Sequence, residues 1–439
     1  MRLCEKVSHT AETPCGFAGR FRTLRKRHAA LREGASQKFP IRYLYTMRKL
    51  SYLLSTIVFL SACQQSQNPK LTSFEVFCEM VANDAKPIAL SHPMEASDLD
   101  KIWKDFQGIA DSYEVSLFRE KDFPVTSLFP ASVTDGKEVV LIYRAPRLVQ
   151  YEQFKNDRAE LEEEAAARRF GRLLGYTPQG TNELLMKNTD FRTLETFGLT
   201  HQTTHLYYAD PAAAIKFYRE TLGLPVAEDS TFQIGKDVSI QIHGFNHDHT
   251  ADQSQSTAIA LLTDQLPAWY AYALEQEIPI KYTYKPRDGG PHDGFVAIDP
   301  GGYLLEFEQF KQHSENELFM AHLENAPKVQ TNIEDLNFYG SITWTYHNDL
   351  LKMQQFYEEV LGFRMVADQG WTKIFQTSSA GFIGLVDERR GMMDYANEKA
   401  VEVEWALSNK DEAIEYFSAS EYWEDGVLVG PELYRYRLR

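Results

Sequence analysis

The chain has 439 residues, too many for one ordinary domain, and its 43% apolar and 25% charged residues are typical of globular protein. Its formal net charge of -16 argues against a nucleic acid partner, because binding to phosphates requires a basic surface. Composition therefore favours a multidomain globular protein with partners other than nucleic acid.

The first 46 residues differ in charge from everything that follows. Residues 1–46 carry ten Lys or Arg side chains and three acidic ones, whereas the rest of the chain carries 36 basic and 59 acidic residues. We expect residues 1–46 to be an upstream extension translated from a mis-assigned start, with translation properly beginning at Met47.

Residues 47–63 resemble a bacterial lipoprotein signal peptide. Arg48 and Lys49 precede an apolar run over 50–60 that is too short to span a bilayer. The run ends in Leu-Ser-Ala-Cys, the order of a lipobox. This resemblance implies lipidation of Cys63, a membrane partner through the lipid anchor, and a place in the cell envelope. Gln64 after the cysteine favours the outer membrane if the cell is Gram-negative. The alternative is a buried helix that merely ends at Cys63.

Residues 71–198 are expected to form a separate, small α+β domain of unknown function. Apolar patterns predict strands at 86–90 and 137–143 and a helix at 95–108. A charged stretch predicts one long helix over 149–174, with a solvated face rather than a binding tract.

The remaining chain repeats itself. The segment KFYRETLGL at 216–224 recurs as QFYEEVLGF at 355–363, an offset of 139 residues. The residues expected to begin and end the helices recur as well. Asp210 can cap the first helix and Asn348 or Asp349 the second, while Gly223 and Gly362 stand where a helix would stop. Each copy then contains a further strand and helix, at 257–262 and 266–276 and at 400–407 and 411–418. Such a repeat indicates duplicated domains.

Two segments carry a family resemblance: HLYYADPAAAIKFYRETLGL at 205–224 and GFVAIDPGGYLLEFEQF at 294–310. Together they resemble the vicinal oxygen chelate superfamily of glyoxalases, bleomycin-resistance proteins and extradiol dioxygenases. The resemblance implies an α+β fold of paired βαβββ modules forming cupped mixed sheets, in tandem domains at 200–312 and 338–439. The second domain is expected to be degenerate and C-terminally truncated, because its eighth strand should come where the chain stops.

In this superfamily, metal ligands come from the first, fourth, fifth and eighth strands of a cup. Carried over to this sequence, the resemblance implies His205 on the first strand, Gln241 near the fourth and Glu306 on the last, holding Fe, Mn, Ni or Zn. The fifth-strand position falls near Thr257, where no histidine stands. The His-rich segment 246–249 is interpreted as a surface loop, and the repeat places Trp344 where the first copy has His205.

The function that this resemblance implies is a divalent-metal-dependent enzyme acting on a small-molecule substrate in the cell envelope. It would be of the lyase, isomerase or ring-cleaving dioxygenase type, with Glu306 as its catalytic base. Two alternatives stay open. One is a metal-free binding protein like those of bleomycin resistance, which the absent fifth-strand ligand favours. The other is an envelope scaffold that only mediates contacts.

Overall fold

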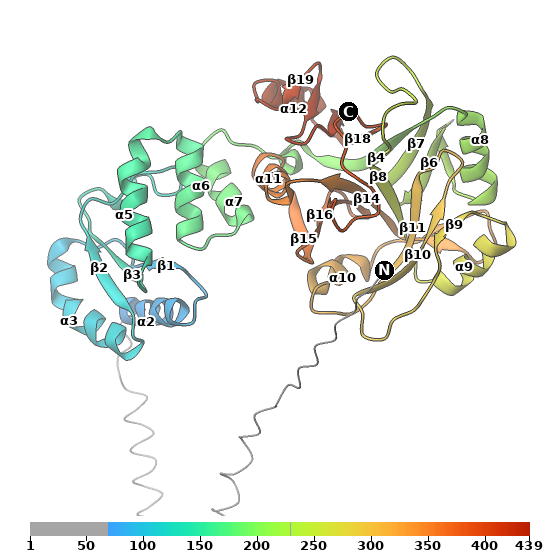
Figure 1. Ribbon diagram of the computed structural model, residues 1–439. Coiled ribbons are helices and arrows are strands. Elements are labelled where there is room, and N and C mark those ends of the chain that lie inside the picture. The colour runs from blue at the N-terminus through green and yellow to red at the C-terminus, as the bar shows by residue number, and fades with distance from the viewer. Residues whose placement is uncertain (1–68, 229) are drawn as a thin grey trace, which may run out of the picture. The chain divides into compact units, whose positions relative to one another are not determined.

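The computed structural model describes residues 69–228 and 230–439 (Figure 1). The predictions for residues 1–46 and for the segment 47–63 with Cys63 lie outside the described residues. Within the described part, no helix is both long enough and apolar enough to cross a bilayer.

The described chain begins with the expected α+β part. A three-stranded antiparallel sheet has the order β1-β3-β2, with β1 at Ile88–Leu90, β2 at Ser116–Glu120 and β3 at Val139–Tyr143. The central strand β3 is apolar and buried on both faces, as its run of branched residues dictates. The helices of this part are α2 (Pro69–Ala82), α3 (Ala96–Ser112), α4 (Ala131–Thr134), α5 (Arg147–Asp157), α6 (Glu163–Leu173) and α7 (Pro178–Asn188).

The single long helix predicted over 149–174 is wrong, because the chain turns between α5 and α6. The break passes through a 3-10 turn at Arg158–Glu160 and an extended Leu161. Phe154 and Phe170 stack with ring centroids 4.9 Å apart, whereas sixteen residues of straight helix would separate them by about 24 Å. Burial of both rings beside β3 therefore requires two antiparallel helices.

Residues 199–438 form four successive βαβββ modules, which we number 1 to 4. Module 1 contains β4 (Leu199–Tyr208), α8 (Pro211–Lys216), β5 (Val226–Glu228), β6 (Thr231–Gly235) and β7 (Val238–Gly244). Module 2 contains β8 (Thr257–Leu262), α9 (Leu266–Glu275), β9 (Ile280–Tyr282), β10 (His292–Ile298) and β11 (Leu304–Phe310). Module 3 contains β14 (Gly340–His347), α11 (Leu350–Gln355), β15 (Arg364–Asp368), β16 (Thr372–Gln376) and β17 (Gly381–Asp387). Module 4 contains β18 (Val401–Leu407), α12 (Lys410–Phe417), β19 (Trp423–Glu424), β20 (Val427–Val429) and β21 (Arg435–Leu438).

Modules 2 and 3 are joined by α10 (Glu317–Leu323) and the short strands β12 (Val329–Gln330) and β13 (Asn337–Phe338). The helices begin and end at the predicted residues. Asp210 accepts a hydrogen bond from the Ala213 N–H, and Asp349 caps α11 in the same way through Lys352. Helices α8 and α11 each continue as a π-helical turn, which ends before Gly223 and Gly362, and both glycines have positive φ.

The predicted fold class is confirmed, but the modules pair in an unexpected order. One eight-stranded sheet has the order β15-β16-β17-β14-β8-β11-β10-β9 and joins modules 2 and 3; we call its concave side cup F. The other has the order β19-β20-β21-β18-β4-β7-β6-β5 and joins modules 1 and 4; we call its concave side cup D. Neither copy of the repeat closes a sheet by itself, because β4 pairs with β18 and β8 pairs with β14. Each cup therefore contains one module from each copy.

The eighth strand that we expected the second copy to lack is present as β21. It pairs in parallel with β18 through Glu402 opposite Arg435, as β11 pairs with β8 through Ala258 opposite Leu304. The strand lacks the Asp-Pro-x-Gly motif that made β11 recognisable, although Leu433 adopts the positive φ of Gly302.

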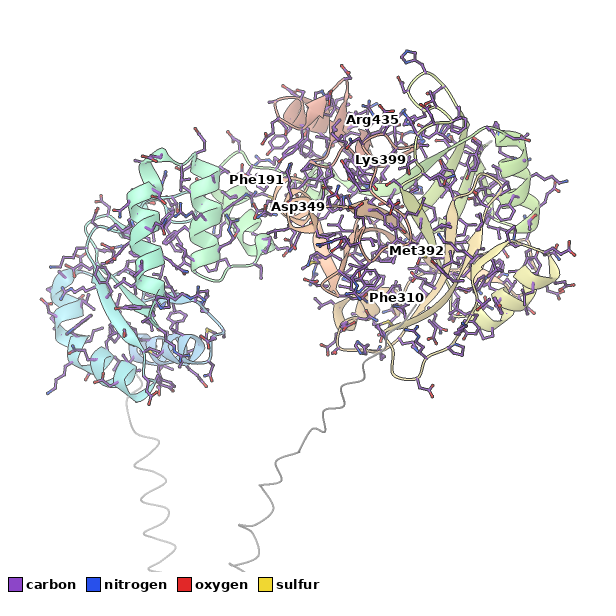
Figure 2. All side chains as sticks on the ribbon, in the orientation of Figure 1. Phe191, Phe310, Asp349, Met392, Lys399 and Arg435 are labelled. Carbon is purple, nitrogen blue, oxygen red and sulfur yellow. The ribbon has the colours of Figure 1, made fainter. Side chains whose placement is uncertain are left out.

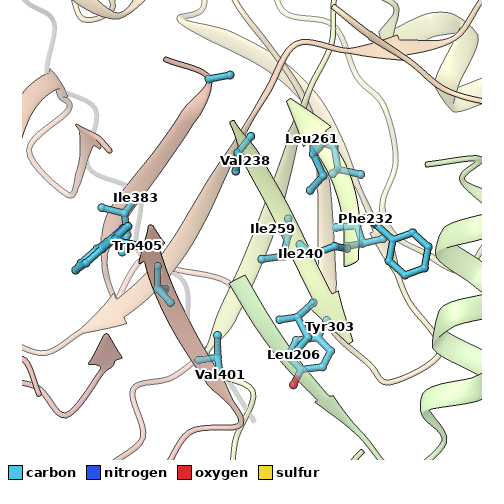
Figure 3. Close-up of a cluster of buried hydrophobic side chains, with 14 of the residues drawn as sticks. Leu206, Phe232, Val238, Ile240, Ile259, Leu261, Tyr303, Ile383, Val401 and Trp405 are labelled. Atoms are coloured by element: carbon cyan, nitrogen blue, oxygen red, sulfur yellow. The ribbon is translucent and has the colours of Figure 1, made fainter. Parts of the chain in front are cut away.

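The convex faces of both sheets pack into one hydrophobic core with the helices (Figure 3). Leu206 and Ile240 from one sheet belong to the same cluster as Ile259 and Leu261 from the other. Buried Gln202 links the sheets through hydrogen bonds to Thr343 and to the Phe382 carbonyl. This arrangement leaves the two concave faces as candidate sites.

Candidate functional site

Cup F encloses a cavity of about 600 Å³. Aromatic side chains line part of its wall, and exposed basic side chains line it as well. Figure 2 labels Phe310 from β11 and Met392 from the segment after β17, two of the lining residues. The others used below are Lys281, Tyr282, Lys285, Arg287, His292, Glu306, Glu308, Trp344, Tyr346, Trp371 and Arg390. A cavity of this size, lined by apolar and polar groups in about equal measure, can hold a small molecule.

Two carboxyl groups from one strand lie on the floor of this cavity. Glu306 and Glu308 are two residues apart on β11 and therefore share its concave face, while Leu305 and Phe307 pack into the core beneath, as the sequence predicts. Burial raises the pKa of Glu306 to about 8, although a hydrogen bond with Glu308 opposes the rise. Burial and the Glu306 charge raise the pKa of Glu308 as well, against a smaller lowering effect of the Trp344 indole. The pair therefore retains a proton near neutral pH.

Three buried polar atoms around the cavity have no hydrogen-bond partner in the protein. They are Oε2 of Glu308, Nε1 of Trp344 and Nδ1 of His292. Glu308 and Trp344 are only 5% and 6% exposed, so bulk water does not readily replace the missing partners. Because buried polar groups are nearly always paired in native proteins, three orphans around one cavity point to a ligand that supplies their partners.

Trp344 owes its position to the absence of a side chain at Gly384. The two residues are register partners on β14 and β17. A Cβ atom built on Gly384 would lie 2.1 Å from Cε3 of Trp344, far closer than atoms in contact can approach. The indole therefore lies directly over the backbone of β17, on the concave side of the sheet.

Cup D contains a different, densely polar cluster. His205 Nδ1 and His243 Nε2 are hydrogen-bonded at 2.8 Å, and the Tyr207 ring stacks on His249 with centroids 3.8 Å apart. Tyr207 also donates a hydrogen bond of 3.1 Å to buried Glu402.

Glu402 carries the charge of this cluster. It forms ion pairs with Arg437 and Arg435 on the adjacent strand, and His249 Nε2 lies 3.3 Å away. Burial alone would raise the pKa of Glu402, but nearby His249 and the hydrogen-bonded Arg437 guanidinium together bring it down to about 2. Burial, with nearby His205, lowers the pKa of His243 to about 4. The cluster therefore holds neutral His243 beside a carboxylate already compensated by guanidinium groups.

The predicted site residues do not form one site. His205 and Gln241 are register partners on β4 and β7, as expected for first-strand and fourth-strand positions. Glu306 lies in the other sheet and lines cup F, which His205 does not. The strand next to His205 is β18, so the fifth-strand position is Glu402 and not Thr257. The error follows from assuming that each copy of the repeat closes its own cup.

The interpretation of 246–249 as a surface loop is wrong for one residue. His249 is 2% exposed, whereas His247 is fully exposed. Spacing alone does not distinguish these two histidines, because the contacts that bury His249, with Tyr207, Lys399 and Glu402, are long-range.

Neither cup offers a metal-ligand set. In cup F, the four superfamily ligand positions hold Trp344, Gly384, Ala258 and Glu306, a single ligating group. In cup D, Arg437 stands at the place of Glu306 and pairs with Glu402. No three His, Cys, Asp or Glu side chains within 69–228 and 230–439 are grouped so as to hold a metal ion. The donors present therefore do not fit the metal that the fold family implies.

Parts of this chain are similar to known proteins. Residues 198–307 match the sequence model of the Glyoxalase/Bleomycin resistance protein/Dioxygenase superfamily. No curated protein matches the chain. Glyoxalase I from Zea mays is 14% identical, with 55% of this chain and 92% of that chain covered and a TM-score of 0.36. A provisionally assigned dioxygenase from Bacillus subtilis is 15% identical over 55% and 84% of the two chains, with a TM-score of 0.36. A mobile-metagenome protein of V. pseudocholerae is 24% identical over 26% and 95%, with a TM-score of 0.21.

Proposed function

We propose, on the premise that residues 198–307 belong to the glyoxalase, bleomycin-resistance and dioxygenase superfamily, that this protein binds a small flat molecule in cup F without a metal ion. The observation that carries the proposal is the set of three orphaned buried polar atoms around an aromatic cavity of about 600 Å³. Superfamily membership supports a small-molecule ligand. The single carboxylate at the four ligand positions of cup F supports metal independence.

Ligand binding in cup F is tested by screening the full chain against planar small molecules, with calorimetry as the readout. Trp371 lines the cavity and is half-buried, so Trp371→Ala should weaken binding about tenfold through loss of a stacking surface. The matched control is Trp423→Ala, another half-buried tryptophan on β19 outside the cavity, which should leave affinity unchanged. Equal losses in both variants would refute cup F as the binding site.

Metal independence is tested on the same protein. Dialysis against a chelator should change neither ligand affinity nor the unfolding midpoint, since no donor set in the described residues depends on an ion. Loss of binding that is restored by one divalent metal would show that the protein depends on that metal.

The carboxyl pair supports a second candidate function, acid–base catalysis in the same cavity. A carboxyl whose pKa is near the working pH is suited to proton transfer, and Glu306, with its pKa raised to about 8 by burial, meets that condition. Turnover of a bound ligand that Glu306→Gln abolishes, with affinity retained, would establish the enzyme. Binding without turnover of any bound ligand would reject it.

We also propose that Cys63 is lipidated and anchors the protein in the cell envelope. The support is the sequence 47–63 alone, with its basic start, short apolar run and lipobox order. Metabolic labelling with a fatty acid should mark the native chain and not Cys63→Ala. Unlabelled native protein that partitions with the aqueous fraction would contradict the anchor.

A further inference from the structure

The mouth of cup F is basic in an acidic protein. Lys281, Lys285, Arg287 and Arg390 all line the cavity and all are exposed, although the chain carries a formal charge of -16. Neighbouring Arg389 is paired with Asp387 at 2.6 Å, but none of these four forms an ion pair within the described residues. Lys281 also acts electrostatically on Glu306, and Arg390 acts on Asp387, but four exposed cations that form no ion pair at one opening still attract an anionic group.

One of these cations is positioned by the cavity wall. The Arg390 guanidinium lies over the Trp371 ring, 4.8 Å from its centroid. A cation–π contact of this kind holds the charge beside the opening and leaves the guanidinium N–H groups available to an anion.

The floor requires a different chemistry. Trp344 Nε1 is a donor without an acceptor, and Glu308 Oε2 has no partner either. The Trp344 indole lowers the Glu308 pKa in the manner of a hydrogen-bond donor, so the two groups face one another, although no direct hydrogen bond joins them. A single hydroxyl group can accept a hydrogen bond from the indole while it donates one to the carboxyl oxygen. Because the carboxyl pair retains a proton, it repels an anion bound at the mouth less than two carboxylates would.

We propose, resting on ligand binding in cup F, that the ligand is a planar hydroxyaryl anion. Its hydroxyl group lies between Trp344 and Glu308, its ring lies among Tyr346, Trp371 and Phe310, and its anionic group faces the basic mouth. The three requirements come from separate parts of the cavity, and a molecule with a hydroxyl at one end of a conjugated body and a carboxylate at the other meets all of them.

The first experiment compares probes on the unmodified full chain by calorimetry. A panel of para-hydroxybenzoate and para-hydroxycinnamate is measured beside the methyl esters, which lack the charge, and the deoxy acids, which lack the hydroxyl. The best hydroxy acid should bind about tenfold more tightly than either of its two counterparts, because each counterpart loses one charge-assisted or buried hydrogen bond. Added salt should weaken binding of the acid and leave the affinity for the ester unchanged.

The second experiment assigns each end of the ligand to its residues. Arg390→Gln should weaken binding of the acid about tenfold and binding of the ester hardly at all. Arg389, one residue away, is paired with Asp387, so Arg389→Gln should change neither affinity. Trp344→Phe removes the orphaned donor while keeping a ring, so it should erase the preference for the hydroxy acid over the deoxy acid.

The outcomes separate this inference from the proposed function. Esters that bind as tightly as acids, with Trp371→Ala weakening both, would leave ligand binding in cup F intact and overturn the anionic assignment. Deoxy acids that bind as tightly as hydroxy acids would overturn the hydroxyl assignment. Binding of none of the panel, when other flat molecules do bind and are sensitive to Trp371→Ala, would likewise overturn this inference alone. Failure of every flat molecule to bind would overturn both.

Discussion

Tyr303 and Tyr434 perform the same structural task in the two halves of the repeat. The Tyr303 hydroxyl accepts the Tyr207 N–H and donates to the Ala400 carbonyl at 2.6 Å. The Tyr434 hydroxyl accepts the Tyr346 N–H and donates to the Ser256 carbonyl, also at 2.6 Å. Each tyrosine directly precedes the last strand of a module in one sheet. It bonds to the first strand of one module in the other sheet and to the residue just before the first strand of the other. The two sheets are therefore linked reciprocally, by buried hydrogen bonds that cross from one to the other.

Removal of either hydroxyl should destabilise the protein to a similar extent. Tyr303→Phe and Tyr434→Phe each leave a buried backbone N–H and carbonyl unpaired, which should cost about 1–3 kcal/mol of unfolding free energy. Urea unfolding of the full chain measures the effect. Tyr113→Phe, which loses only an exposed 3.4 Å contact with Glu75, is the control and should change stability by less than about 0.5 kcal/mol.

The elements of each module can be predicted from the sequence because interactions between residues close in the chain determine them. The helix cap at Asp210 and the terminal glycines act within a few residues, and both appear in the structure as predicted. Resemblance to a known family added the cupped sheet, which local patterns do not specify.

The pairing of modules could not be predicted in the same way. Nothing local to β4 decides whether the partner of His205 is Thr257 or Glu402, almost 200 residues away. The candidate site was misplaced for this reason, and the functional residues in cup F that we missed include Trp371 from module 3 and Arg390 just after it. Trp344 was noted as filling a ligand position, but its role beside Glu308 depends on β14 pairing with β8.

The carboxyl pair should make stability depend on pH. Burial raises the pKa of Glu306 to about 8, above its value in the unfolded chain. At pH values between the unfolded and the folded pKa, the folded state therefore binds more protons than the unfolded state. The stabilisation is complete below the unfolded pKa and is lost as the pH rises through the folded one. Between about pH 5 and pH 8, unfolding free energy should fall by on the order of 2 kcal/mol through this group.

Urea unfolding across this pH range tests the Glu306 assignment by difference. The unfolding free energy of Glu306→Gln should fall less with rising pH than that of the parent protein. The exposed variant Glu334→Gln should follow the parent curve. His243, whose pKa burial lowers to about 4, contributes an opposite trend that is common to all three proteins and cancels in the difference. Parallel curves for parent and Glu306→Gln would contradict a raised Glu306 pKa.

In cup D, the charge of Glu402 should depend on Arg437. Arg437→Gln removes a half-exposed guanidinium from a carboxylate that is 2% exposed, and we expect a loss of about 2 kcal/mol of unfolding free energy. The control is Arg439→Gln, where a more exposed pair with Glu404 at 3.4 Å should contribute less than about 0.5 kcal/mol. Equal effects of the two substitutions would show that Arg437 does not compensate a buried charge.

The ligand cavity should be sensitive to one methyl group that does not line it. Gly384→Ala places a Cβ atom 2.1 Å from the Trp344 indole, so the ring must leave the floor of cup F. We expect a loss of about 1–3 kcal/mol in stability and at least about tenfold weaker ligand binding. Gly108→Ala in α3, where an added Cβ meets nothing within 4 Å, should instead stabilise the protein by about 0.5–1 kcal/mol and leave binding unchanged. Affinity retained in folded Gly384→Ala would show that the position of Trp344 over β17 is not needed for binding, and would remove the indole N–H from the list of ligand contacts.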